Sequence, residues 1–217
     1  MKWSAQLLGA LAAAAIFLSP AGGETEKLQA IELMPPERAG GKPLMAALQE
    51  RSSRREFSGK KLPAQTLSNL LWAAFGVNRS ESGKRTAPSA RNMKEIDIYV
   101  ALPEGLFLYD GGAHILRPVL KEDIREFTGE QAFTQQAPVN LIYVANRGRM
   151  GSLDDGQKDF YSAVDTGFIS QNVYLFCSSE GLATVVLGWV DKPALEKKMG
   201  LREDQKVILT QPVGYPE

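Results

Sequence analysis

The stretch KDFYSAVDTGFISQNVYLFCSSEGL, residues 158–182, decides the fold of this chain. Its apolar side chains recur at helical spacing, so that Phe160, Val164 and Phe168 would share one face. Gly181 is the type of residue that ends a helix. The stretch therefore predicts a long central helix that is apolar on nearly every side. Either the core of a large monomer or the interface of a dimer would bury such a helix.

The segments around this stretch alternate between helical and extended patterns. Helices are expected at residues 44–50, 62–77, 120–129 and 191–201. Strands are expected as a strand–turn–strand unit within 95–119, and at 137–146, 183–190 and 205–216. A long polar loop is expected at residues 77–92. Because helices and strands are mixed along the chain, we predict one α+β domain over residues 44–217, with a mixed central sheet flanked by helices.

The N-terminal residues have the composition of an export signal. Lys2 precedes an apolar run at residues 7–18, and small residues follow it, so residues 1–21 are predicted to be a signal peptide. The run is shorter than the roughly 20 residues of a membrane-spanning helix. A short N-terminal anchor is the alternative. Residues 22–43 are polar and rich in Gly and Pro, which predicts an extended arm. We expect a periplasmic or secreted protein with no stable membrane anchor after cleavage.

Charge and composition exclude several classes of function. The chain has 25 Lys and Arg against 25 Asp and Glu, so no overall field favours nucleic acid. Cys177 is the only cysteine and His114 the only histidine. This leaves almost no parts for a transition-metal site, a Ser-His triad or an internal disulfide. Cys177 lies in an apolar run, which favours a buried structural thiol.

A basic segment, RSSRREFSGKKLP at residues 51–63, is the first candidate site. Arg51, Ser53 and Arg55 alternate, so they share one side if the chain is extended. Forked guanidinium donors match the geometry of a phosphate. The alternative is that these cations complement the negative C-terminal end of the helix at 44–50. Both readings stay open from this segment alone.

Four segments in order resemble one family. They are RSSRREF, LSNLLWAAFGVN, GKRTAPSARN and DTGFISQNVYLFCSSEGLATVVLGWVD. They resemble the nitroreductase family of FMN-dependent oxidoreductases, and within it most closely the SagB-type or thiazole-oxidase-like dehydrogenases. The resemblance covers roughly residues 44–217. It implies a nitroreductase-like fold, bound FMN, and hydride transfer between flavin N5 and a small organic substrate.

The resemblance also assigns cofactor contacts by position. They fall on Arg51, Ser53, Arg55, Pro88, Ser89, Asn92, Gly188 and Trp189. The first three would hold the phosphate, ribityl chain and pyrimidine oxygens, and Asn92 would hydrogen-bond the flavin ring. The turn at Gly188 would present its backbone to N5. Each residue alone also fits a structural role in a turn, bulge or core. The pattern singles out no acid–base residue; Tyr99, Tyr161 and Glu180 are candidates.

The family binds its flavin between the subunits of an intertwined dimer, so the resemblance implies a homodimer that acts on a small molecule. Two further functions remain open. One is a non-catalytic flavin-binding or ligand-binding module that has kept the fold. The other is a subunit of a peptide-modifying complex, which rests on family analogy alone.

Overall fold

The computed structural model describes residues 27–217. The predicted signal peptide and the first residues of the predicted arm lie outside this range. The helices are α1 (Leu44–Glu50), α2 (Ala64–Phe75), α3 (Phe133–Gln136), α4 (Asp155–Glu180) and α5 (Lys192–Met199). The strands are β1 (Ile31–Glu32), β2 (Val77–Arg79), β3 (Lys84–Arg85), β4 (Ile96–Leu102), β5 (Gly105–Asp110), β6 (Ile115–Leu120), β7 (Val139–Asn146), β8 (Ala183–Thr184) and β9 (Gln205–Gly214). Short 3₁₀ turns occupy Ala90–Asn92, Arg125–Thr128 and Arg147–Met150.

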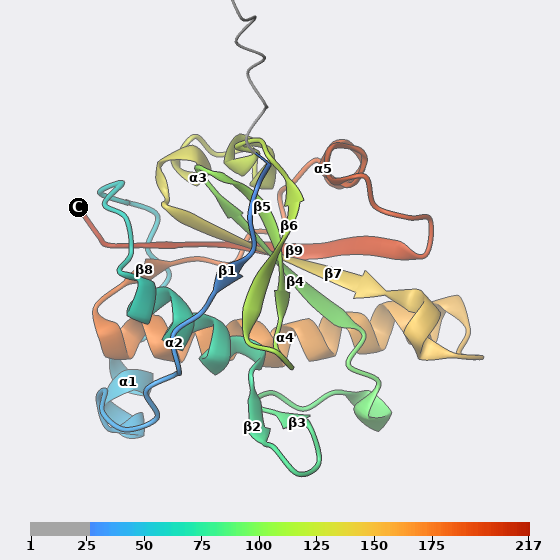
Figure 1. The fold of residues 1–217 in the computed structure, drawn as a ribbon, viewed down its shortest axis with the longest axis horizontal. Coiled ribbons are helices and arrows are strands. Elements are labelled where there is room, and N and C mark those ends of the chain that lie inside the picture. The colour runs from blue at the N-terminus through green and yellow to red at the C-terminus, as the bar shows by residue number, and fades with distance from the viewer. Residues whose placement is uncertain (1–26) are drawn as a thin grey trace, which may run out of the picture.

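One seven-stranded sheet organises the chain, with strand order β1-β6-β5-β4-β7-β9-β8 (Figure 1). Every described pair of neighbouring strands is antiparallel, which corrects the prediction of a mixed sheet. The α+β class is confirmed. Helix α4 runs the width of the molecule across one side of the sheet. Residues 31 and 32 of the predicted arm pair with β6 and form the outer edge of the sheet.

Two apolar cores cover the two faces of the sheet. Helices α2 and α4 pack on one face, for example through Leu71 and Val173 against Tyr143. Helix α5 packs on the other through Leu195 against Ile142. Strand β7 is therefore buried on both faces, as its unbroken apolar run predicted.

The long helix begins and ends at strong signals. Asp154 and Gln157 form a reciprocal capping box at its start, and Gly181 ends it with a left-handed φ of 68°. The predicted helix end at Gly76 is also confirmed, but for a different reason: a Cβ there would lie 2.4–2.8 Å from atoms of Trp72. Only glycine fits against that ring.

Four sequence predictions of secondary structure need correction. The strand–turn–strand unit predicted at 95–119 continues into a third strand, β6. The predicted strand at 183–190 keeps only β8 and a single bridge between Leu187 and Thr210, because the backbone between them bonds to α4. The predicted loop at 77–92 contains the β2–β3 hairpin, which turns at Gly83 with φ 60°. The predicted helix at 120–129 is only a 3₁₀ turn.

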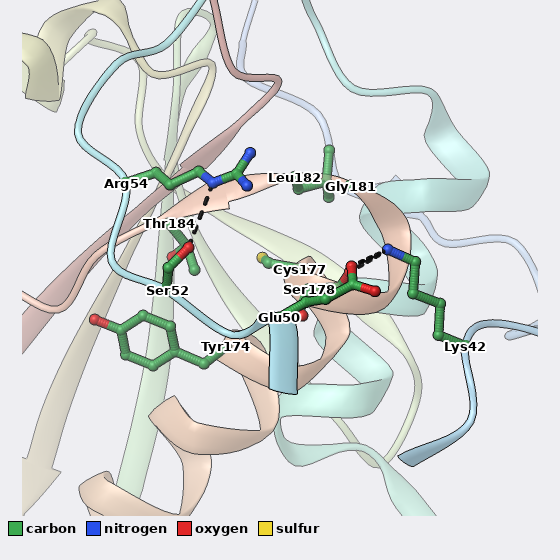
Figure 2. Close-up of a pocket in the computed structure, with 10 residues that line it drawn as sticks. All are labelled: Lys42, Glu50, Ser52, Arg54, Tyr174, Cys177, Ser178, Gly181, Leu182 and Thr184. Carbon is green, nitrogen blue, oxygen red and sulfur yellow. Dashed lines mark hydrogen bonds and ion pairs between the residues drawn. The ribbon is translucent and has the colours of Figure 1, made fainter. Parts of the chain in front are cut away.

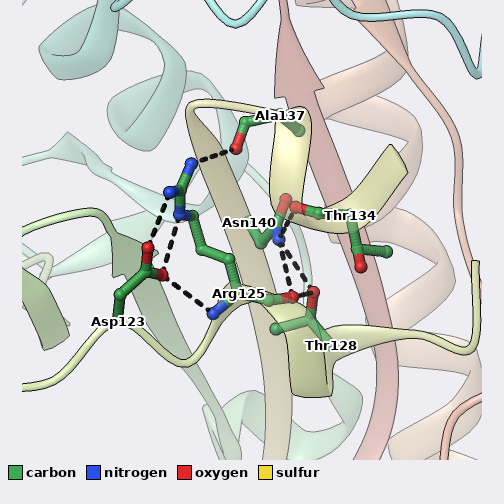
Figure 3. A network of polar contacts seen from close by, with 6 residues as sticks. All are labelled: Asp123, Arg125, Thr128, Thr134, Ala137 and Asn140. Atoms are coloured by element: carbon green, nitrogen blue, oxygen red, sulfur yellow. Dashed lines mark hydrogen bonds and ion pairs between the residues drawn. The ribbon is translucent and has the colours of Figure 1, made fainter. Parts of the chain in front are cut away.

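A buried polar network explains why that last segment is not a full helix (Figure 3). The carboxylate of Asp123 accepts from the backbone and the guanidinium of Arg125. Buried Asn140 donates to Thr128 Oγ1 at 2.8 Å and to the Thr134 carbonyl at 2.7 Å. These side chains satisfy backbone groups that a continuing helix would otherwise pair.

Candidate functional site

The basic segment lies against the C-terminal half of α4. Ser53 Oγ lies 2.9 Å from the Tyr174 hydroxyl, and the Arg51 guanidinium sits 5.2 Å from the centre of the Tyr174 ring. The backbone N–H of Arg54 donates to the Thr184 carbonyl at 3.0 Å. The segment is therefore held between a helix and β8. It does not continue α1, which ends at Glu50.

The segment borders two cavities. Ser53 and Arg55 line a cavity of about 510 Å³ near the last residues of the described chain, together with Arg54 and Glu56. Ser52 and Arg54 line a separate cavity of about 70 Å³ beside Cys177 (Figure 2). Arg54 lines both cavities and Arg51 lines neither, so the predicted shared side of Arg51, Ser53 and Arg55 stays a prediction. Cys177 is buried, and burial raises the pKa of its thiol, so it suits a structural role.

Tyr174 connects this segment to the turn that the resemblance assigned to flavin N5. Its hydroxyl accepts the Val186 N–H at 2.9 Å as well as bonding Ser53. Two residues later, a Cβ on Gly188 would meet only Leu209, at 3.7 Å. The chain itself does not require glycine there, so the turn has open space beside it. Trp189 projects outward with 71% of its surface exposed. No local sequence pattern indicated this role of Tyr174.

The second group of predicted residues lies elsewhere on the molecule. Pro88, Ser89 and Asn92 line a cavity of about 190 Å³ under the β2–β3 hairpin. Ser89 Oγ accepts the Lys94 N–H at 3.0 Å. Arg91, Asn92 and Lys94 have left-handed φ values of 52°, 58° and 51°. Non-glycine residues in that region cost about 1–3 kcal/mol each, and such strain gathers at functional sites.

One buried carboxyl group anchors this loop to α4, and a second lies close to it. The Ala90 N–H donates to Asp165 Oδ2 at 2.7 Å. Glu95 is fully buried, and both of its side-chain oxygens lack a hydrogen-bond partner within residues 27–217. Burial and the neighbouring Asp165 raise the pKa of Glu95 to about 8. The protonated form of Glu95 is therefore favoured at neutral pH, and it limits repulsion between the two carboxyls.

The structure does not bring the two groups of predicted residues together within one subunit. Their anchors, Asp165 and Tyr174, are nine residues apart on α4, which is about 13 Å along the helix axis. The cavity beside Ser53 and the cavity beside Ser89 have no lining residue in common. The two groups of predicted residues thus lie in separate places on one chain, and each group is called a half-site below.

An apolar stripe runs along the outer side of α4. Phe160, Val164 and Phe168 are 63%, 37% and 46% exposed, while the inner side packs through residues such as Ile169 and Val173. The predicted long helix is thus confirmed, but it is not apolar on nearly every side, since Asp165 and Thr166 are among its buried residues. Its apolar stripe stays uncovered in one chain. Helix α1 exposes more apolar side chains: Leu44, Met45 and Leu48.

Of the acid–base candidates, Tyr99 lies on the wrong side of the sheet. It is buried in the core under α5, where its hydroxyl accepts from Gln205 at 3.4 Å. It faces neither half-site. Within residues 27–217, no cluster of three or more His, Cys, Asp or Glu side chains could hold a metal ion. No helix in the same range is long and apolar enough to cross a membrane.

Comparison with known proteins identifies the family to which this chain belongs. Residues 48–215 match the sequence profile described as the Nitroreductase family. A candidate nitroreductase of Methanocaldococcus jannaschii is 31% identical over 175 residues, covering 76% of this chain and 87% of that protein. The crystal structure of a candidate nitroreductase from Ralstonia eutropha JMP134 superimposes with a TM-score of 0.83 at 45% identity, covering 87% and 90% of the two chains.

A more distant match shares the fold alone. A chain of the Escherichia coli microcin synthetase complex McbBCD, solved with truncated pro-MccB17 bound, gives a TM-score of 0.67 at 18% identity. The match covers 96% of this chain and 85% of that one. The nitroreductase-like fold expected from the sequence is confirmed by these comparisons.

Proposed function

Because this chain belongs to the nitroreductase family, we propose that it is an FMN-dependent oxidoreductase acting on a small organic substrate. The flavin, when bound, would supply the hydride chemistry at N5. Arg51, Ser53 and Arg55 are the proposed contacts for its phosphate and ribityl end. The observation that carries this proposal is the link from Ser53 through Tyr174 to the Val186 backbone. It fastens a cationic segment beside a turn with open space.

The donor set of the basic segment fits an anionic cofactor end. Arg51, Arg54 and Arg55 form no ion pair with any residue of the described chain. Their charges are thus free to meet an added phosphate, which guanidinium groups bind through paired hydrogen bonds. At the turn, the backbone near Gly188 would orient the flavin ring.

A second copy of the chain would complete the site. The two half-sites are separated along α4, and the exposed stripe of Phe160, Val164 and Phe168 lies on that same helix. Packing two such stripes about a two-fold axis would bury them, and could bring the Asn92 loop of one subunit to the Ser53 segment of the other. The proposed functional unit is therefore a homodimer in which both subunits contribute to each flavin site.

Export is the second part of the proposal. It rests on the composition of residues 1–21, which predicts a periplasmic or secreted protein that acquires FMN after translocation. The alternative of a subunit in a peptide-modifying complex is favoured by one observation, the match to the microcin synthetase chain over 96% of this chain. A co-purifying partner from the native compartment would identify that role.

The test is a titration of the purified mature chain with FMN, followed by absorbance and fluorescence. We expect a yellow protein with one FMN per subunit. In Arg51→Gln/Arg55→Gln, loss of two charged contacts should weaken FMN binding by a hundredfold or more, on the order of 3 kcal/mol. Lys197→Gln, an exposed change on α5, is the matched control. A colourless chain that binds no FMN contradicts the proposal.

Turnover separates an enzyme from a non-catalytic module. Bound FMN in an enzyme should be reduced by a donor and reoxidised by an acceptor over many cycles. A chain that binds FMN but shows no cycling with nicotinamide, quinol or thiol donors would favour the flavin-binding module.

A further inference from the structure

The cavity under the β2–β3 hairpin has an unusual charge. Its charged lining residues are Arg79, Lys84, Arg85 and Lys94, with no carboxylate among them. A neighbouring cavity of about 400 Å³ shares Arg85 and Lys94 but contains carboxylates as well. There Asp97 and Asp110 are paired with Arg149 and Arg117. The lining of the smaller cavity therefore has an excess of positive charge, with Asp97 and Asp110 of the neighbouring cavity as the nearest carboxylates that act on Arg85. Because the whole chain has a formal net charge of zero, this charge is a local feature.

The Arg85 side chain is held in the wall of this cavity, but only part of its guanidinium has hydrogen-bond partners. Its Nη1 donates to the Phe75 carbonyl at 2.7 Å, and its guanidinium lies 4.7 Å from the centre of the Phe75 ring. A Cβ on Gly111 would come within 2.1 Å of Nη1, so the chain makes room for this group. The hydrogen bond to the Phe75 carbonyl, at the C-terminal end of α2, explains the position of Nη1 but not of the other guanidinium nitrogens. Arg85 Nε is buried and has no acceptor within the described residues.

The two lysines are also without partners. The ammonium groups of Lys84 and Lys94 have no ion-pair or hydrogen-bond acceptor among residues 27–217. Arg79 is the exception, since it donates to the Arg85 carbonyl at 2.8 Å and to Asn78 Oδ1 at 3.0 Å. Cations that line one cavity repel one another, and a bound oxyanion would reduce that repulsion.

We propose that this cavity holds the carboxylate or phosphate group of a small organic substrate, so that the enzyme acts on an anion. The inference rests on the proposed function, because Pro88, Ser89 and Asn92 line the same cavity and are the proposed flavin-ring contacts. A volume of about 190 Å³ suits an oxyanion group but is below the 300–1,000 Å³ of a typical ligand pocket. The adjoining 400 Å³ cavity offers room for the rest of the molecule.

The test measures anion binding apart from flavin binding. Inorganic phosphate and benzoate, which represent the two oxyanions, are titrated calorimetrically into the Arg51→Gln/Arg55→Gln chain, where the proposed flavin-phosphate contacts are absent. Adding Lys84→Gln or Lys94→Gln should weaken the Kd of the preferred probe about tenfold each. Adding Lys197→Gln, on exposed α5, should leave it unchanged. The stronger of the two probes identifies the oxyanion.

The outcomes distinguish this inference from the proposed function. No saturable binding of either probe, or equal binding in the Lys94→Gln and Lys197→Gln chains, overturns the anion site even if the parent chain binds FMN. If anion binding depends on the lysines but the parent chain takes up no FMN, the anion site is supported and its assignment to an oxidoreductase substrate is overturned. If Lys94→Gln does not fold, Lys84→Gln on the exposed hairpin carries the same test.

Discussion

The two half-sites are fastened to the same helix by different chemistry. Near the C-terminal end of α4, hydroxyl groups of Ser53 and Tyr174 and the Val186 N–H form neutral hydrogen bonds. Nine residues earlier, Asp165 accepts the Ala90 N–H of a loop whose backbone is strained, and buried Glu95 lies near this carboxylate. The stability that the neutral anchor contributes should change little with pH. The stability of the carboxyl anchor should depend strongly on pH, because burial raises the pKa of Glu95.

Glu95→Gln should have the largest effect. Unfolded Glu95 loses its proton near pH 4.5, whereas burial and Asp165 keep the pKa of folded Glu95 at about 8. The folded state therefore binds more protons between these values. This contribution to stability is fully present below pH 4.5 and is lost as the pH rises to about 8. Relative to Glu95→Gln, the parent should lose on the order of 1.4 kcal/mol of unfolding free energy per pH unit in that window.

Denaturant unfolding at both ends of the window measures this difference. Arg149 acts against the shift, since its charge lowers the pKa of Glu95. Glu203→Gln, an exposed change near β9, is the matched control and should leave the pH profile of the parent intact. Parallel pH profiles for the parent and Glu95→Gln would show that Glu95 does not titrate in this window.

Phe168→Asp tests whether the half-sites meet across a dimer. Burying a Phe side chain contributes about 1.5–3 kcal/mol, and a two-fold interface would bury it twice. We expect the dimer to dissociate and FMN affinity to fall with it. The fold of one subunit should persist, because Phe168 is 46% exposed there. Sedimentation equilibrium and FMN titration measure the two effects.

Val119→Asp is the control, since Val119 is 42% exposed on β6, away from α4. It should leave both assembly and FMN binding unchanged. A Phe168→Asp monomer with the FMN affinity of the parent would mean that one subunit builds the whole site.

Tyr174→Phe should disturb the neutral half-site. The change removes the acceptor of the Val186 N–H and the partner of Ser53, and an unpaired, partly buried donor costs about 1–3 kcal/mol. The loss of unfolding free energy in Tyr174→Phe should be equal at pH 5 and pH 8, whereas the effect of Glu95→Gln should differ between these pH values. Tyr161→Phe on the same helix is the control, since no hydrogen bond of its hydroxyl is found in the described chain. A pH-dependent loss would contradict the neutral anchor.

The sequence predicted the elements that local pattern controls. Helix α4 with its end at Gly181 and the doubly buried β7 follow from spacing and capping chemistry. The Ser53–Tyr174 contact could not be predicted this way, because it joins residues 121 positions apart. The segment after β8 was mistaken for a strand for the same reason, since its Val186 N–H bonds a side chain from α4 and not a neighbouring strand.

The candidate site shows the same division. Motif order correctly indicated the family, and the family match extends over residues 48–215. The separation of the half-sites and the carboxyl pair of Asp165 and Glu95 depend on tertiary packing. Nothing in the pattern around Glu95 distinguishes a buried carboxyl from a solvated one.

Arg91→Gly should have the smallest effect, and it tests the strain in the carboxyl-anchored loop. Arg91 is exposed, with φ 52° and ψ 18°. A side chain in this region costs about 1–2 kcal/mol, while glycine costs about 0.5–1 kcal/mol through the entropy of the unfolded chain. We expect the free energy of unfolding, measured by thermal denaturation, to rise by about 0.5 kcal/mol. Ser152→Gly, an exposed turn residue without a left-handed φ, should instead lose about that amount. If both variants lose stability equally, the loop at Arg91 stores no strain, and the contrast between the half-sites is one of charge alone.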